Sequence, residues 1–230
     1  MVKNSVGIAF DFEGPMVTLE EGHHKAHLET AKEVGLNLTL NKALKILPHF
    51  LGGPDEAVAQ DIFNFAQKSS PEEIHNRKKE LFEKWLKDLK VIPTRKGLID
   101  FLKQLEKDKI SYVIGTATAK DKFKYYLERT PFKNYFPDGK IIFGEDVKNN
   151  KPDPDVYLAT AKLMGINPQN QIVFEDSPRG VKAAVAAGSH AFGLPVYHNK
   201  ITNKILLDAG ATKIFNEWGD VKIKDLILII

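Results

Sequence analysis

The sequence predicts an α/β protein in which helices cover both faces of a parallel sheet and an all-helical segment is inserted early in the chain. Two observations favour this class. A short apolar strand pattern at residues 6–10 is followed by a long region with helical patterns alone. From about residue 97, strand and helix patterns alternate, which is typical of right-handed crossovers in a parallel sheet. We expect a discontinuous core, 1–17 and 90–230, and a helical domain, 18–89.

The core elements are expected in a regular order. Each strand is a short apolar run, and helices such as those stopped by Gly165 and Gly188 separate the runs. The expected strands are 6–10, 110–114, 141–143, 171–174, 190–194 and 212–215. The expected helices are 97–107, 120–129, 153–164, 178–187 and 201–209.

The inserted segment is expected to contain several helices. Gly35 ends the first helical pattern, and Gly52-Gly53-Pro54 interrupts the second. Ser70 has the features of an N-cap, with Pro71 at the first helical position and Glu73 at the third. Apolar residues then recur at three-to-four spacing, so this helix is expected to pack one face.

Composition narrows the class of protein. Of 230 residues, 43% are hydrophobic and 27% are charged, as in ordinary globular proteins. The chain has no cysteine, which excludes disulfides, thiolate metal sites and cysteine nucleophiles. A net charge of +3 with scattered lysines does not favour nucleic-acid binding. Residues 1–5 do not resemble a leader, and the sequence has no run of about 18 apolar residues, so we expect a cytoplasmic protein without membrane contact. We also expect a monomer or a weak homodimer.

Two carboxylates follow the first strand. Asp11 and Glu13 lie one residue apart before Gly14, at the carboxyl edge of the sheet, where open α/β sheets bind ligands. In an extended segment their side chains face the same side. Such a pair suits a divalent cation or an acid and base with separated pKa values. Two solvated acids at a strand end remain the alternative.

Three further strand ends carry polar residues. Gly115-Thr116-Ala117-Thr118 offers hydroxyls and close main-chain amides to an anion. Lys151, before two prolines, suits a point charge on phosphate. Glu175-Asp176 is a second acid pair at the start of a helix. Taken singly, these residues fit a turn threonine, a solvated lysine and a helix cap. Together with Asp11 and Glu13 they make four polar strand ends, and four in this order favour a functional site.

The order of Asp11-x-Glu13-Gly14, Thr116, Lys151 and Glu175-Asp176 resembles the haloacid dehalogenase superfamily. The helical insert after the first strand resembles that of the β-phosphoglucomutase-like subfamily of phosphatases and phosphomutases. The resemblance implies a Rossmann-like core with a helical cap and an active site between them. It also implies a Mg²⁺-dependent phosphatase that hydrolyses a small phosphorylated metabolite through an aspartyl-phosphate. A halide-removing enzyme is disfavoured, because the acid pair and Lys151 together favour metal and phosphate.

The resemblance also assigns roles to residues. Asp11 would be the nucleophile and Glu13 the general acid and base. Asp11, Asp176 and the main-chain carbonyl of Glu13 would hold the metal, with Glu175 assisting directly or through water, and Mg²⁺ prefers such oxygen ligands. The phosphoryl oxygens would be held by Thr116, the amide of Ala117, and Lys151.

Glu13 is the main departure from the family pattern, since its phosphatases usually have aspartate there. The extra methylene moves the carboxyl group by roughly one bond length, and a misplacement of about 1 Å can cost about a hundredfold in rate. Two alternatives stay open, the second of them because of Glu13. One is a phosphomutase, and the other is a weakly active or non-catalytic binding protein that keeps the metal site.

The insert contributes candidates for substrate contact. His23 matches a position near the hinge that is often histidine in the subfamily, and it either touches substrate or has a structural role. Lys78 either brings a charge to the cleft or, as we favour, lies on a solvated helix face. Asp55 lies near the position of a phosphate-binding arginine in the sugar-phosphate mutases, which argues against a phosphoglucomutase. A zinc site at His23, His24 and His27 is disfavoured without an HExxH pattern.

Overall fold

The computed structural model describes residues 6–137 and 139–228, so residues 1–5, where no leader is expected, lie outside the described residues. The chain forms two compact units, divided between Thr18 and Leu19 and between Lys90 and Val91. We call them the core unit and the helical unit. None of the helices in the described ranges is long and apolar enough to cross a membrane.

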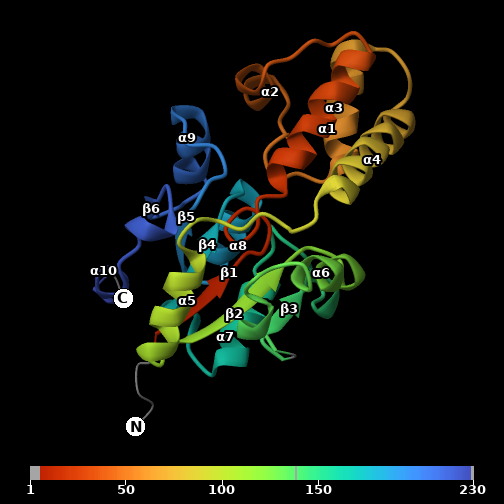
Figure 1. The fold of residues 1–230 in the computed structure, drawn as a ribbon. Helices are drawn as coiled ribbons and strands as arrows, with labels where there is room; N and C mark the ends of the chain where they lie inside the picture. The colour runs from red at the N-terminus through yellow and green to blue at the C-terminus, as the bar shows by residue number, and fades with distance from the viewer. Residues whose placement is uncertain (1–5, 138, 229–230) are drawn as a thin grey trace. The chain divides into compact units, whose positions relative to one another are not determined.

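The core unit is built on a six-stranded parallel sheet with strand order β3-β2-β1-β4-β5-β6, as Figure 1 shows. The strands are β1 (Gly7–Phe10), β2 (Ser111–Thr116), β3 (Ile141–Phe143), β4 (Gln171–Glu175), β5 (His190–Gly193) and β6 (Lys213–Ile214). The helices are α5 (Leu98–Lys107), α6 (Lys120–Leu127), α7 (Asp155–Met164), α8 (Pro178–Ala186), α9 (Lys200–Asp208) and α10 (Ile223–Ile227). The predicted α/β class with a parallel sheet is confirmed.

The ends of most core elements lie within two residues of the expectation. Two differences are described further. Strand β2 continues to Thr116 because Gly115 and Thr116 pair with Ile142 and Phe143 of β3, so Thr116 ends a strand and does not lie in the turn. Helix α10 was not predicted, since its five residues give too short a pattern to separate from a terminal apolar run.

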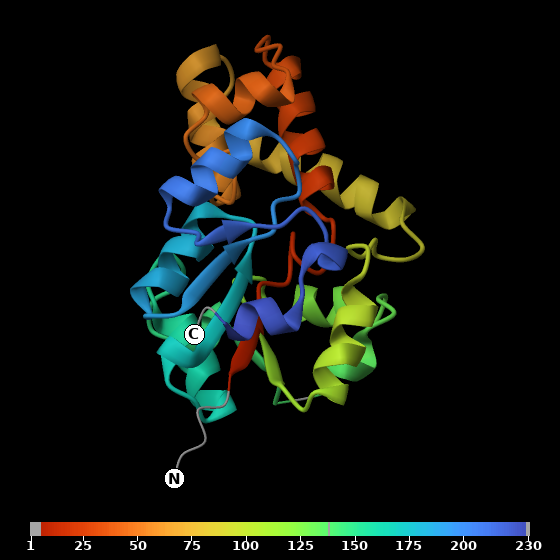
Figure 2. The same ribbon diagram turned by 90° about the vertical axis from the view of Figure 1, so that its left-hand side faces the viewer.

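The two faces of the sheet are packed differently. One face carries Ala9, Val113, Val173 and Ala191, and these small side chains pack against residues of α7, α8 and α9. The other face carries aromatic rings, where Phe10 contacts Phe101 of α5, Phe174 and Trp218. Figure 2 shows the sheet between these helix layers. Small residues on the first face let α7 and α8 approach the sheet closely. The chain segments next to these two helices therefore lie near the ends of the strands.

The helical unit contains α1 (Glu20–Glu33), α2 (Leu40–Ile46), α3 (Asp55–Ala66) and α4 (Pro71–Asp88). The predicted start of α4 is confirmed: Ser70 Oγ accepts from the Glu73 amide at 3.2 Å, and Glu73 Oε2 accepts from the Ser70 amide at 2.9 Å. Our preference for a solvated Lys78 is wrong, because only 1% of that residue is exposed. It lies on the buried stripe of α4, four residues after Ile74 and four before Phe82.

The chain segments that leave and re-enter the core unit run side by side. Val17 and Thr94 form an antiparallel bridge. The Thr18 amide donates to the Pro93 carbonyl at 2.9 Å, and the Arg95 amide donates to the Met16 carbonyl at 3.0 Å. The buried Arg95 side chain also donates to the carbonyls of Pro195 and Asn216, at 2.9 and 2.6 Å. The core backbone is therefore paired across the point of insertion.

Candidate active site

The candidate site lies where the strand order of the sheet reverses direction, between β1 and β4. Phe10, the last residue of β1, pairs with Ile114 of β2 and Phe174 of β4. The next residue of each segment, Asp11, Gly115 and Glu175, therefore lies at the same level at the carboxyl edge. In open α/β sheets this crevice is the usual place for a ligand.

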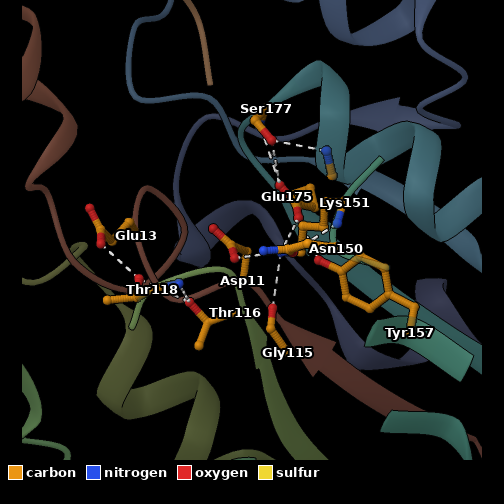
Figure 3. Close-up of polar contacts among 11 residues, drawn as sticks. Asp11, Glu13, Gly115, Thr116, Thr118, Asn150, Lys151, Tyr157, Glu175 and Ser177 are labelled. Carbon is orange, nitrogen blue, oxygen red and sulfur yellow. Dashed lines mark hydrogen bonds and ion pairs between the residues drawn. The ribbon is translucent and has the colours of Figure 1, made fainter. Parts of the chain in front are cut away.

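Lys151 joins these three residues. Its Nζ donates to Asp11 Oδ1 at 2.6 Å, Glu175 Oε1 at 2.7 Å and the Gly115 carbonyl at 3.0 Å (Figure 3). The Lys151 side chain is only 6% exposed, and its three ammonium protons match the three acceptors. Burial lowers the pKa of Lys151, but the charges of Asp11 and Glu175 outweigh it and raise the pKa above the usual range. The lysine is therefore a fixed buried cation.

Asp11, Glu175 and Asp176 form a group of carboxylates that could hold a metal ion, with one oxygen from each within 4.8 Å of the others. Lys151 offsets only part of their charge. Burial raises the pKa of Asp11 to about 8, against the lowering effect of Lys151, and the charge of Glu175 raises it further. An excess of buried negative charge on oxygen ligands suits a divalent cation, and Mg²⁺ in particular.

Two glycines make room for these carboxylates. A Cβ atom on Gly14, which has φ of 87°, would lie 2.2 Å from Asp176 Oδ2. A Cβ atom on Gly180 would lie 1.8 Å from Glu175 Oε1. Both distances are far below van der Waals contact, so only glycine fits beside the two carboxylates. The main chain at Gly14 therefore lies directly against Asp176, and the main chain at Gly180 lies directly against Glu175.

Glu175 has two further partners that the sequence analysis missed. The Tyr157 hydroxyl on α7 donates to Glu175 Oε1. Ser177 Oγ donates to Glu175 Oε2 at 3.1 Å and accepts from the Gly180 amide at 3.0 Å, which caps α8. Ser177 precedes Pro178 at a helix start, so its role as cap was readable from the sequence. Tyr157 gave no such signal, because only the packing of α7 against the sheet brings it to β4.

The Glu13 carboxylate does not join the three-carboxylate group. The chain bends at Phe12, and Glu13 Oε1 accepts from Thr118 Oγ1 at 2.7 Å. Figure 3 shows Glu13 directed toward Thr118, while Asp11 is directed toward Lys151. Asp11 and Glu13 therefore lie at one strand end but have different partners. The sequence did not predict that Thr118 contacts Glu13, although Thr118 lies two residues after Thr116 and carries a hydroxyl.

Two of the three residues expected to hold a phosphoryl group, Thr116 and Ala117, stand at the end of β2, and the third, Lys151, comes from the segment before α7. Thr116 is 1% exposed, and its Oγ1 accepts from the Thr118 amide at 3.0 Å. Ala117 follows it and is exposed. Since Lys151 reaches the neighbouring Gly115 carbonyl at 3.0 Å, the hydroxyl, amide and ammonium donors are gathered at one sheet edge. Such a set of donors suits an anion with several oxygens.

The substrate candidates of the helical unit are brought together with Asp55. Lys78 Nζ lies 2.6 Å from His23 Nδ1 and donates to Asp55 Oδ2 at 2.5 Å. The other carboxylate oxygen, Oδ1, lies 3.0 Å from His27 Nε2. Burial raises the pKa of Asp55, but hydrogen bonds from His23 and His27 and the charge of Lys78 outweigh it and hold the pKa below its usual range. The charge of Lys78 is therefore largely offset within the helical unit.

Comparison with known proteins agrees with the geometry. A family model described as haloacid dehalogenase-like hydrolase matches residues 8–194. A phosphorylated carbohydrates phosphatase of Thermotoga maritima is 30% identical over 207 residues, which cover 89% of this chain and 91% of that protein. The fructose-1-phosphate phosphatase YqaB of Escherichia coli is 28% identical over 193 residues, 83% of this chain and 97% of that protein. The crystal structure of a haloacid dehalogenase-like protein from Agrobacterium tumefaciens has a TM-score of 0.83 at 21% identity and covers 98% of both chains.

Proposed function

The chain belongs to the haloacid dehalogenase-like hydrolase family, and we propose from this premise that it is a Mg²⁺-dependent phosphatase acting on a small phosphomonoester. The observation that carries the proposal is the bridge from Lys151 Nζ to Asp11 Oδ1 and Glu175 Oε1, at 2.6 and 2.7 Å. It supports a nucleophile held at a fixed place beside a buried positive charge. The same charge suits the phosphoryl oxygens.

In the proposed reaction, a carboxylate oxygen of Asp11 forms a bond to phosphorus while the bond between phosphorus and the leaving oxygen breaks. Glu13 gives a proton to the leaving oxygen, so the alcohol departs neutral. In the second step Glu13 takes a proton from water, the water oxygen bonds to phosphorus, and the bond to Asp11 breaks. Thr116 and the Ala117 amide hold the phosphoryl oxygens, which their place at the end of β2 supports, and the positive charge of Lys151 offsets the charge of those oxygens.

Asp11, Glu175 and Asp176 are proposed to hold Mg²⁺, together with the Glu13 main-chain carbonyl. The fit rests on the oxygen donor set and on the incomplete offset of its negative charge by Lys151. When bound, Mg²⁺ supplies positive charge that offsets the repulsion between Asp11 and an anionic phosphoryl group. Around that charge, Lys151, Tyr157 and Ser177 keep the carboxylates in place.

We propose a phosphorylated sugar or polyol as the substrate. This is supported by the relatives, one of which is a phosphatase of phosphorylated carbohydrates and another of fructose 1-phosphate. In the helical unit, the His23 side chain is 22% exposed and that of Lys78 is 1% exposed. We therefore propose the His23 ring, and not Lys78, as the substrate contact of the helical unit, with Lys78 Nζ 2.6 Å from His23 Nδ1.

The test measures phosphate release from a panel of sugar and polyol monophosphates with Mg²⁺. Wild type is expected to turn over at least one ester. Asp11→Asn should lower kcat by at least about 10³-fold, because it removes the attacking oxygen. Glu13→Gln should lower kcat by roughly 10²–10⁴-fold.

The same panel separates the alternatives. Turnover that survives Asp11→Asn would rule out the nucleophile. A requirement for a bisphosphorylated sugar as activator would indicate a phosphomutase. An inactive wild type that becomes active as Glu13→Asp would indicate a binding protein derived from an enzyme.

A further inference from the structure

We propose that Thr118 is a positioning residue whose hydroxyl holds Oε1 of Glu13 and so sets the direction in which Glu13 gives and takes the proton. The inference rests on the proposed function, in which Glu13 is the acid and base. Thr118 comes from the segment that follows β2, while Glu13 comes from the segment that follows β1. The contact therefore joins two strand ends that are distant in sequence.

A chain of hydroxyl groups fixes the direction of this contact. Thr116 Oγ1 accepts from the Thr118 amide at 3.0 Å and donates to Thr118 Oγ1 at 3.0 Å. Thr118 Oγ1 then donates to Glu13 Oε1 at 2.7 Å. Each hydroxyl has a single proton, and the proton of Thr118 is the one that reaches Glu13. The proton of Thr116 can turn to a phosphoryl oxygen without disturbing that contact. The proton of Thr118 is thus directed at the carboxylate.

The consequence is a fixed orientation of the Glu13 carboxyl group. Oε1 accepts the Thr118 proton, so the group cannot turn about its last bond without losing that hydrogen bond. In Figure 3 the second oxygen of Glu13 is directed away from Thr118. The Thr118 hydroxyl therefore sets the direction from which Glu13 reaches a reacting group.

Glutamate needs such a contact more than aspartate does. It has one more rotatable bond, and ordering it costs more conformational freedom. A hydrogen bond to a charged oxygen offsets this cost, and a misplacement of about 1 Å can lower a rate by about a hundredfold. Aspartate is one methylene shorter, so the same contact would require the main chain to move. Thr118 and Glu13 therefore form a matched pair.

The experiment compares Thr118→Val, which removes the hydroxyl at nearly constant shape, with Thr118→Ser, which keeps it. Thr118→Val should lower kcat by roughly 10- to 100-fold with little change in KM, because the amide of residue 118 still holds Thr116. Thr118→Ser should recover most of the lost kcat. In the Glu13→Gln background, Thr118→Val should cause no further loss. Thr212→Val, the same change at an exposed threonine before β6, serves as control.

Equal losses from Thr118→Val in both backgrounds, or a rise in KM alone, would overturn the inference. A crystal structure of Thr118→Val provides a readout that does not depend on turnover. Glu13 should leave its wild-type position there, and an unchanged side chain would overturn the inference as well. Absence of turnover in wild type contradicts the proposed function, while the position of Glu13 in this crystal still decides the role of Thr118.

Discussion

At the scale of single residues, Lys151 is the cation that contacts two of the site's carboxylates. It is the buried cation between Asp11 and Glu175, with distances of 2.6 and 2.7 Å, and it also holds the end of β2 through Gly115. Removing one partner of a buried charge group leaves the others without compensation. Its loss is therefore expected to affect folding as well as catalysis.

Lys151→Met should lower the free energy of unfolding of the metal-free protein by about 3–5 kcal/mol, because the buried Glu175 carboxylate loses its counter-charge and Asp11 loses its hydrogen-bond donor. Urea unfolding at neutral pH in the presence of a chelator measures the change. Lys204→Met is the matched control, since Lys204 pairs with Asp208 at 2.8 Å on the surface. That substitution should cost less than about 1 kcal/mol. Equal costs for the two variants would contradict the assignment.

At the scale of elements, two serine N-caps of the same kind differ in what else they contact. Ser70 caps α4 and forms a reciprocal pair with Glu73. Ser177 caps α8 and also donates to Glu175 Oε2 at 3.1 Å. One cap therefore stabilises a helix alone, and the other joins a helix start to the carboxylate group.

Ser70→Ala and Ser177→Ala should each lower the free energy of unfolding by about 1 kcal/mol, because each leaves a first-turn amide without its acceptor. Only Ser177→Ala should also lower turnover, by roughly 10- to 100-fold, because a supporting contact to a metal-binding carboxylate is lost. Denaturant unfolding and a Mg²⁺ titration of kcat on the same preparations check both parts. A comparable loss of turnover in Ser70→Ala would show that the effect is not specific to Glu175.

At the scale of the whole molecule, stability should depend on two histidines buried in the helical unit. His24 is 2% exposed, and its Nε2 lies 3.0 Å from the Phe50 carbonyl. Burial lowers the pKa of His24 to about 3 and that of His27 to about 4. Glu20, His23, Asp55 and Lys78 face these rings, and Lys78 disfavours a further positive charge.

The free energy of unfolding should fall as the pH falls from 6.5 toward 4. Both rings stay neutral in the folded protein, while in the unfolded chain they take up protons below pH 6.5. Each histidine should contribute a slope of at most about 1.4 kcal/mol per pH unit. Urea unfolding at several pH values measures the slope, and His24→Gln, which keeps a donor for Phe50, should reduce it. A slope that is the same in wild type and His24→Gln would contradict the prediction.

Much of this molecule could be predicted from its sequence, for a definite physical reason. Parallel strands end at one edge, so residues that follow them, such as Asp11 and Glu175, converge whatever lies between them. Contacts made by helix packing were not predictable in this way, as Tyr157 shows. Lys78 was expected to be exposed because it is charged, but its spacing from Ile74 and Phe82 places it on the buried face of α4. The direction of Glu13 was missed because the bend at Phe12 breaks the alternation of an extended strand.

The bridge between Val17 and Thr94 determines how the core tolerates change at the point of insertion. The segments on either side of the insertion are hydrogen-bonded neighbours, so for the core the helical unit takes the place of a hairpin loop. The entropic cost of closing such a loop rises only slowly with its length. The core should therefore tolerate insertions and deletions within the helical unit, whereas the substrate contact proposed for His23 would change with them.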